Sequence, residues 1–143
     1  MFLLLVALAA AAPPTVKDCS SGTSVFTVNA ASLVPADPIP GQNVTLHLEY
    51  TVPPGVTVTG GQSTFAITYN FIPFSPTVEP LCQDIPCPLG PGSYSNNTVS
   101  TWPSGLSGTV VSTLKWQDTD ANQLLCISIT AKMMKSTSPP PKR

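Results

Sequence analysis

Prolines and glycines interrupt this chain so often that long helices are excluded. The 143 residues include 17 Pro and 9 Gly, which separate apolar segments without the fixed repeat of a collagen. They gather in short groups at 35–41, 53–55, 60–61, 86–92 and 103–108. A proline inside a helix removes a backbone hydrogen bond and clashes with the preceding turn. We therefore expect short strands joined by turns.

Between these groups, apolar and polar residues alternate with the period of two that marks a half-buried strand. The clearest strand covers 44–50, similar patterns cover 65–71, 110–117 and 125–129, and weaker ones cover 25–28, 77–81 and 94–101. About seven short antiparallel strands predict an all-β sandwich of two sheets. The side chains predicted to face inward along the clearest strands are those of Leu48, Tyr50, Phe65, Ile67, Tyr69, Val110, Leu114 and Trp116.

The N-terminal residues have the pattern of a secretory signal peptide. An apolar run at 2–8 ends in alanines at 9–12 and is too short to span a bilayer. Cleavage is expected after Ala11, because cleavage one residue later would place Pro13 directly downstream. The alternative is a buried N-terminal strand. The predicted organisation is a signal peptide at 1–11, one domain at 12–135 and a disordered Pro-rich tail at 136–143.

Four cysteines in an oxidising compartment predict two disulfides, with three possible pairings. We favour Cys19–Cys126, because these residues lie near the two ends of the domain, and Cys82–Cys87, because they flank a short local loop. A zinc site is the alternative, but the spacing does not match paired Cys-x-x-Cys ligands. No metal and no cofactor are expected. Two sequons, which begin at Asn43 and Asn96, predict exposed glycosylation sites.

Composition and motifs argue against nucleic-acid binding and catalysis. The net charge is −1, with 6 Lys and Arg against 7 Asp and Glu, whereas nucleic-acid binders carry a clustered basic surplus. The sole histidine, His47, lies on the polar face of its strand without a G-x-S-x-G motif. The segment 118–122 resembles the start of an EF-hand loop, but Gln123 and Ile129 replace the required Gly and Glu, so it predicts a turn. No catalytic residue and no enzyme activity are expected.

The remaining feature is apolar. Bulky residues at 71–74 are interrupted by Pro73 and Pro76, which prevent pairing in a central strand and predict a sheet edge. Trp102-Pro103 ends a strand in the same way. Large apolar groups at such strand ends suit the mouth of a cavity between two sheets. Ordinary packing in the core is the alternative.

Several short motifs, taken in order from Lys17 to Met133, resemble one known family. They are Lys17-Asp18-Cys19-Ser20, Gly41-Gln42-Asn43-Val44-Thr45-Leu46, Ile72-Pro73-Phe74-Ser75-Pro76, Glu79-Pro80-Leu81-Cys82, Cys87-Pro88-Leu89, Trp102-Pro103-Ser104, Leu114-Lys115-Trp116-Gln117 and Leu125-Cys126. In this order and spacing they resemble the ML lipid-recognition domain family, most closely its small soluble sterol carriers. This chain departs from those carriers in two places. It has prolines instead of a third disulfide near 35–41, and Trp102 stands where they have Tyr.

The resemblance implies an immunoglobulin-like sandwich whose sheets separate to hold one lipid. It implies a secreted or endolysosomal carrier, expected to be monomeric, that binds and transfers a sterol and meets a membrane or membrane-protein acceptor transiently. Phospholipid transfer (phosphatidylinositol or phosphatidylglycerol) or lipid sensing as a co-receptor is the alternative within the family. A structural or adhesion immunoglobulin-like module is the alternative outside it. The predicted lipid-binding residues are Ile72, Phe74, Trp102 and Pro103 at the mouth, with Tyr69, Phe65, Val110 and Leu114 behind them.

Overall fold

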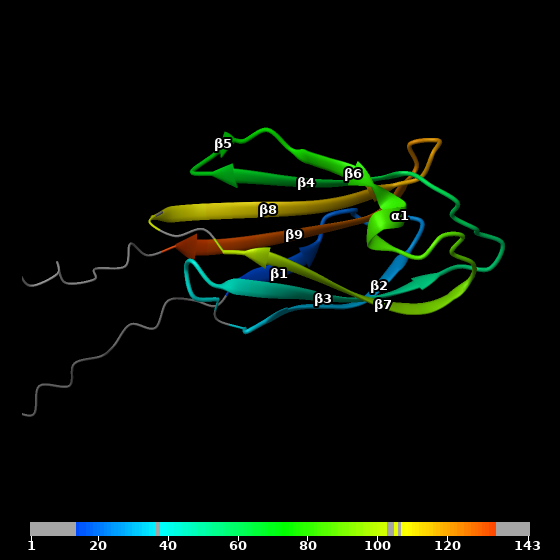
Figure 1. Ribbon diagram of the computed structural model, residues 1–143, viewed down its shortest axis with the longest axis horizontal. Helices are drawn as coiled ribbons and strands as arrows, with labels where there is room; N and C mark the ends of the chain where they lie inside the picture. Colours follow the sequence, from blue (N-terminus) through cyan, green and yellow to red (C-terminus); the bar gives the residue numbers. More distant parts are fainter. Residues whose placement is uncertain (1–13, 37, 103–104, 106, 134–143) are drawn as a thin grey trace, which may run out of the picture.

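The computed structural model describes residues 14–36, 38–102, 105 and 107–133 (Figure 1). The predicted signal peptide, the predicted Pro-rich tail and Pro103 lie outside the described residues. The strands are β1 (Thr15–Asp18), β2 (Thr27–Val34), β3 (Asn43–Val52), β4 (Gln62–Tyr69), β5 (Ile72–Pro73), β6 (Thr77–Pro80), β7 (Gly92–Thr101), β8 (Gly108–Gln117) and β9 (Gln123–Met133), with one helical turn, α1 (Leu81–Asp84), after β6.

These strands form two antiparallel sheets that pack face to face. The larger sheet has the order β1-β9-β8-β4, and both β5 and β6 pair with β4 at its outer edge. The smaller sheet has the order β2-β3-β7. In Figure 1 the larger sheet lies above and the smaller one below, with α1 at the side between them. The predicted all-β, two-sheet sandwich is confirmed.

The described strands differ from the expected ones in number and in bounds. Nine strands are present where about seven are expected, because β1 and β5, of four and two residues, are too short for alternation to reveal. The strand β2 begins and ends later than the predicted 25–28. A bulge between Val28 and Ala30 shifts its register, and a single alternating pattern therefore does not follow the whole strand. The segment 118–122 forms the predicted turn, in which Asp118 Oδ1 accepts hydrogen bonds from the backbone N–H groups of Asp120 and Asn122.

The core fills one end of the space between the sheets. The Tyr50 ring stacks on Phe26, with centroids 5.3 Å apart, and meets the buried Trp116 ring edge to face at 5.4 Å. Burial, together with the nearby Tyr94, raises the pKa of Tyr50 to about 12. The buried side chains of Leu81, Ile85 and Leu89 cover the same cluster from α1 and the loop after it.

Both predicted disulfides are present. Cys19 follows β1 and is bonded to Cys126 in β9, with 5.0 Å between the Cα atoms and a sequence separation of 107. The Cys19 N–H also donates to the Cys126 carbonyl at 2.9 Å. The second bridge joins Cys82 in α1 to Cys87. The long bridge therefore ties the first strand to the last, and the short one closes the turn beside α1. Within the described ranges, no helix has the length and hydropathy needed to cross a membrane.

Candidate functional site

A cavity of about 350 Å³ lies between the two sheets, next to the packed core. Its size falls in the usual range of small-molecule sites. The smaller sheet supplies one wall and the larger sheet the other. The lining residues are Leu33, Val44, Leu46, Thr98, Val99, Ser100, Thr101 and Trp102 on one side, and Ser63, Phe65, Ile67, Thr77, Glu79, Asp84, Ser112, Leu114 and Ile129 on the other.

The cavity exists because small side chains occupy inward positions in the larger sheet. Ser63 on β4 and Ser112 on β8 are buried, with 5% and 7% of their surface exposed, and both line the cavity. Large apolar side chains flank them along the same face, including Phe65 after Ser63 and Leu114 after Ser112. Two serines cannot fill the space that two leucines would fill, so the sheets enclose a hollow here.

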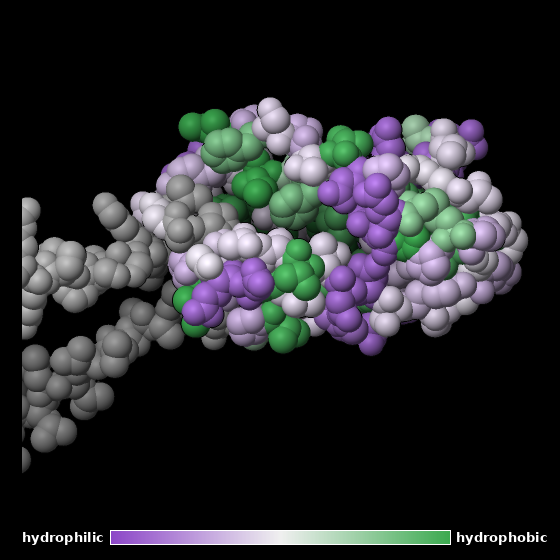
Figure 2. All heavy atoms as spheres, in the orientation of Figure 1, coloured by the Kyte–Doolittle hydropathy of each residue, from purple (hydrophilic) through white to green (hydrophobic). Residues whose placement is uncertain are grey.

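One side of the cavity lies between the edges of the two sheets. Strand β6 is at the edge of the larger sheet and β7 at the edge of the smaller one, and no backbone pairing of described residues joins them. At one end α1 bridges the gap, because Asn96 Nδ2 in β7 donates to the Asp84 carbonyl at 2.7 Å. Figure 2 views this side and shows apolar side chains in a depression between the two layers. A ligand can therefore enter between β6 and β7.

The structure brings together three of the eight predicted lipid-binding residues. Phe65, Trp102 and Leu114 line the cavity. Trp102, 6% exposed, is fixed because its N–H donates to the Gln42 carbonyl and its own carbonyl accepts from the Gly41 N–H. Val110 is buried in the core cluster outside the lining, and Tyr69 packs against that cluster.

Two more predicted residues lie outside the lining. Ile72 and Phe74, with 63% and 54% exposure, stand on the outer edge formed by the β4–β5 hairpin. Pro103 lies outside the described residues. The sequence prediction missed several residues that line the cavity. They are Leu33, Val44, Leu46, Ile129 and the two serines, Ser63 and Ser112. Alternation places Val44 and Leu46 on an inner face, but it cannot separate a cavity wall from a filled core.

The β4–β5 hairpin presents apolar side chains to solvent in a braced turn. Asn70 and Phe71 both adopt positive φ, 46° and 67°, and Phe71 is 90% exposed. The Asn70 N–H donates to the Thr109 carbonyl and its Oδ1 accepts from the Thr109 N–H, both at 2.9 Å. Gly108 permits this contact, because a Cβ there would meet Asn70 Oδ1 at 2.2 Å. The tyrosine hydroxyl of Tyr69 also bonds the Ser107 backbone.

The outer face of the smaller sheet carries His47, as the alternation predicts. Its Nδ1 lies 2.7 Å from Asn97 Oδ1 and its Nε2 lies 3.3 Å from Glu49 Oε1. Hydrogen bonds to Asn97 and then to Glu49 raise the pKa of His47, because each acceptor favours the doubly protonated ring. Neither His47 nor Glu49 lines the cavity.

The sequons differ from the expectation in one respect. Asn43 is exposed as predicted, and its Oδ1 accepts from the Thr101 hydroxyl. Asn96 is half-buried, because it occupies an inward position of β7 and its amide bonds α1. Its neighbour Asn97, not Asn96, holds the outward position. Among the described residues, no group of three or more His, Cys, Asp or Glu side chains is placed to hold a metal ion.

A family model described as the ML domain matches residues 14–133 of this chain. A Dictyostelium discoideum protein, provisionally named a phosphatidylglycerol/phosphatidylinositol transfer protein, is 25% identical over 133 residues, which cover 90% of this chain and 93% of that protein. A second Dictyostelium protein with the same provisional name is 24% identical over 124 residues, covering 84% of this chain and 81% of its own length.

Solved structures share the fold. The crystal structure of a Niemann-Pick type C2 protein from the Japanese carpenter ant superposes with a TM-score of 0.65 at 15% identity, covering 84% of this chain and 99% of the ant protein. Chicken MD-1, crystallised with lipid IVa, superposes with a TM-score of 0.53 at 12% identity, covering 83% of this chain and 88% of its own. Since the family model spans nearly the whole described chain, this protein belongs to the ML family of lipid-binding domains.

Proposed function

We propose that this protein carries a single lipid and delivers it to membranes in the secretory or endolysosomal lumen, with a sterol as the first candidate ligand. The observation that carries this proposal is the cavity of about 350 Å³ between the sheets, which is reached between β6 and β7. Two disulfides fit an oxidising compartment. The predicted signal peptide at 1–11 supports the same location.

The proposed mechanism is desolvation, with no bond made or broken. Removing apolar surface from water contributes roughly 25 cal/mol per Å². The walls that would receive the hydrocarbon carry Leu46, Phe65, Leu114 and Ile129, none of which can hydrogen-bond a ligand through its side chain. The lipid therefore gains most of its affinity by leaving water, and it can return to a bilayer without a chemical step.

Phospholipid transfer is the second candidate. The Dictyostelium relatives that align over most of this chain carry the provisional name of phosphatidylglycerol/phosphatidylinositol transfer proteins. A phospholipid would place its acyl chains in the same cavity and its head group at the gap between β6 and β7.

Native mass spectrometry of the protein secreted by eukaryotic cells tests the proposal. We expect a mass increment of one lipid, and extraction followed by lipid analysis identifies it. Competition between a fluorescent sterol and phosphatidylinositol then separates the two candidates. Protein that carries no lipid and binds neither competitor would contradict lipid carriage and favour a structural immunoglobulin-like module.

Delivery requires a surface that meets the membrane, and the β4–β5 hairpin suits this role. Phe71, Ile72 and Phe74 are exposed there, and no charged residue occurs between Glu49 and Glu79. Phe71 carries backbone strain because its φ is positive. Since 90% of its surface is exposed, packing within the protein does not offset this strain. Strand β4 links this hairpin to the cavity, because Ile67 lines the cavity and its carbonyl accepts from the Phe74 N–H. A neutral lipid surface is the partner that an uncharged, aromatic tip favours.

Phe71→Gly is expected to reduce binding to phosphatidylcholine vesicles by roughly tenfold or more. Inserting one large apolar side chain contributes about 1.5–3 kcal/mol. The melting temperature should stay equal or rise, because glycine adopts positive φ without strain. Vesicle flotation measures the first effect and thermal unfolding the second, with Phe71→Trp as the control that keeps vesicle binding. Unchanged flotation of the glycine variant would show that another surface meets the membrane.

A further inference from the structure

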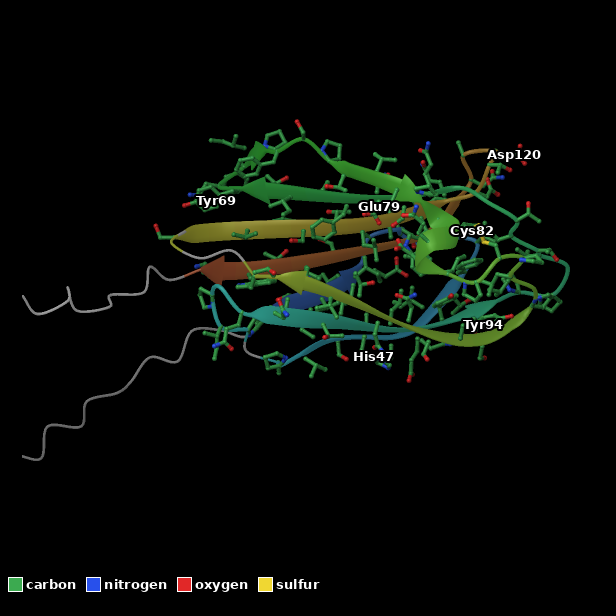
Figure 3. All side chains as sticks on the ribbon, in the orientation of Figure 1. His47, Tyr69, Glu79, Cys82, Tyr94 and Asp120 are labelled. Carbon is green, nitrogen blue, oxygen red and sulfur yellow. A yellow bond between two sulfur atoms is a disulfide. The ribbon has the colours of Figure 1, made fainter. Side chains whose placement is uncertain are left out.

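The charged residues in the cavity lining come from β6 and α1. Ser63 on β4 stands directly opposite Glu79 on β6 in the register of the larger sheet, and both line the cavity. Asp84, at the end of α1, lines the same region. Figure 3 shows Glu79 where β6 approaches α1. Ser63, Glu79 and Asp84 are named the α1 subsite below.

The polar side chains of the α1 subsite have no partners among the residues that the structure describes. Ser63 is 95% buried, since only 5% of its surface is exposed, yet its hydroxyl makes no hydrogen bond there. The carboxylates of Glu79 and Asp84 pair with no described cation, because the one ion pair in that part of the chain joins His47 and Glu49. Since the Ser63 side chain lines the cavity, its hydroxyl can bond a polar group that is supplied by a ligand.

Two polar side chains of β7 already have partners within the protein. Asn96 on β7 donates its amide to the Asp84 carbonyl at 2.7 Å, and its Oδ1 accepts from the Thr98 hydroxyl at 3.1 Å. These bonds hold β7 and α1 together, and they use the backbone carbonyl of Asp84, not its carboxylate. None of the described lysines, Lys17, Lys115 and Lys132, lines the cavity.

We propose that the α1 subsite binds the polar group of the lipid and selects one that donates hydrogen bonds and carries no negative charge, such as a sterol hydroxyl. Ionised carboxylates only accept hydrogen bonds, and the Ser63 hydroxyl can donate or accept. The same carboxylates repel a phosphate group. This inference rests on the proposed lipid carriage and deepens it, because it orders the two candidate ligands: neutral lipids bind better than phosphatidylglycerol or phosphatidylinositol.

The expected selectivity is modest for each carboxylate. Two like charges about 4 Å apart in water repel by about 1 kcal/mol, which is a factor of about five in affinity. Salt weakens the repulsion, because the screening length falls to about 3 Å at 1 M. A sterol has no charge, so salt should not change its affinity through this route.

The test compares a fluorescent sterol and a fluorescent phosphatidylglycerol on the wild-type protein and on Glu79→Gln, Asp84→Asn and the double variant. We expect each single variant to bind phosphatidylglycerol about fivefold more tightly. Sterol affinity should fall or stay level. Ser63→Ala should weaken the sterol and not the phosphatidylglycerol. Asp120→Asn is the matched control, because it removes the same charge in the β8–β9 turn, outside the cavity lining.

Each outcome bears on one proposal. If the double variant binds the sterol normally and phosphatidylglycerol no better than Asp120→Asn does, the α1 subsite is overturned and lipid carriage stands. If the wild-type protein, folded by circular dichroism, binds neither lipid, lipid carriage itself fails. A wild-type preference for phosphatidylglycerol that high salt leaves unchanged would also overturn the subsite.

Discussion

Replacing both Cys19 and Cys126 with serine is expected to lower the free energy of unfolding by about 2–5 kcal/mol, the range for a native bridge in a small secreted domain. The bridge spans 107 residues of sequence, and the chain-entropy estimate for such a loop is near the top of that range. It also holds the end of β1 on β9, where Cys19 and Cys126 already share a backbone hydrogen bond. Without it, β1 at the sheet edge should detach first.

Cys82→Ser with Cys87→Ser is the matched control. This bridge spans five residues, and the same estimate gives only about 2 kcal/mol. Urea unfolding measures both variants, and the midpoint should fall further for the long bridge. Hydrogen exchange should show early loss of protection in β1 for the first variant and around α1 for the second. Equal losses for the two variants would contradict the loop-length argument.

The sandwich could be predicted because alternation and turn residues agree along most of the chain. Period-two patterns predict the positions of β3, β4, β8 and β9, because one face of such a strand packs on the core and the other faces solvent. The disulfide pairing followed from chain position alone. The bounds of β2 could not be predicted, because the bulge between Val28 and Ala30 breaks the alternation.

The candidate site was only partly predictable, because a pattern reports which way a side chain points and not what it meets there. Alternation places Leu114, Val110 and Ser112 on one face of β8, yet Leu114 and Ser112 line the cavity and Val110 packs in the core. Phe74 matches a mouth position by resemblance, yet the positive φ values at Asn70 and Phe71 turn the chain outward before it. The small size of Ser63 and Ser112 was the available signal for a hollow.

Filling the cavity at Ser112 should abolish lipid binding while the protein stays folded. Ser112 is 7% exposed, and its side chain meets the hollow between β8 and the smaller sheet. A phenylalanine ring at this position would occupy space that the lipid needs, so Ser112→Phe is expected to weaken binding of either candidate lipid by more than tenfold. Because the ring enters a hollow, the melting temperature should change by only a few degrees.

Two further variants distinguish loss of space from other causes. Ser112→Ala removes the hydroxyl without adding volume and should keep most of the affinity. Val110→Phe places the same ring two residues away on the same face, where Val110 is 2% exposed and packed in the core. Overpacking there costs about 1–3 kcal/mol, which should lower the melting temperature by several degrees. Lipid titration and thermal unfolding should therefore rank the two phenylalanine variants in opposite orders. The cavity assignment is wrong if Ser112→Phe lowers the melting temperature as much as Val110→Phe does and the folded fraction still binds lipid normally.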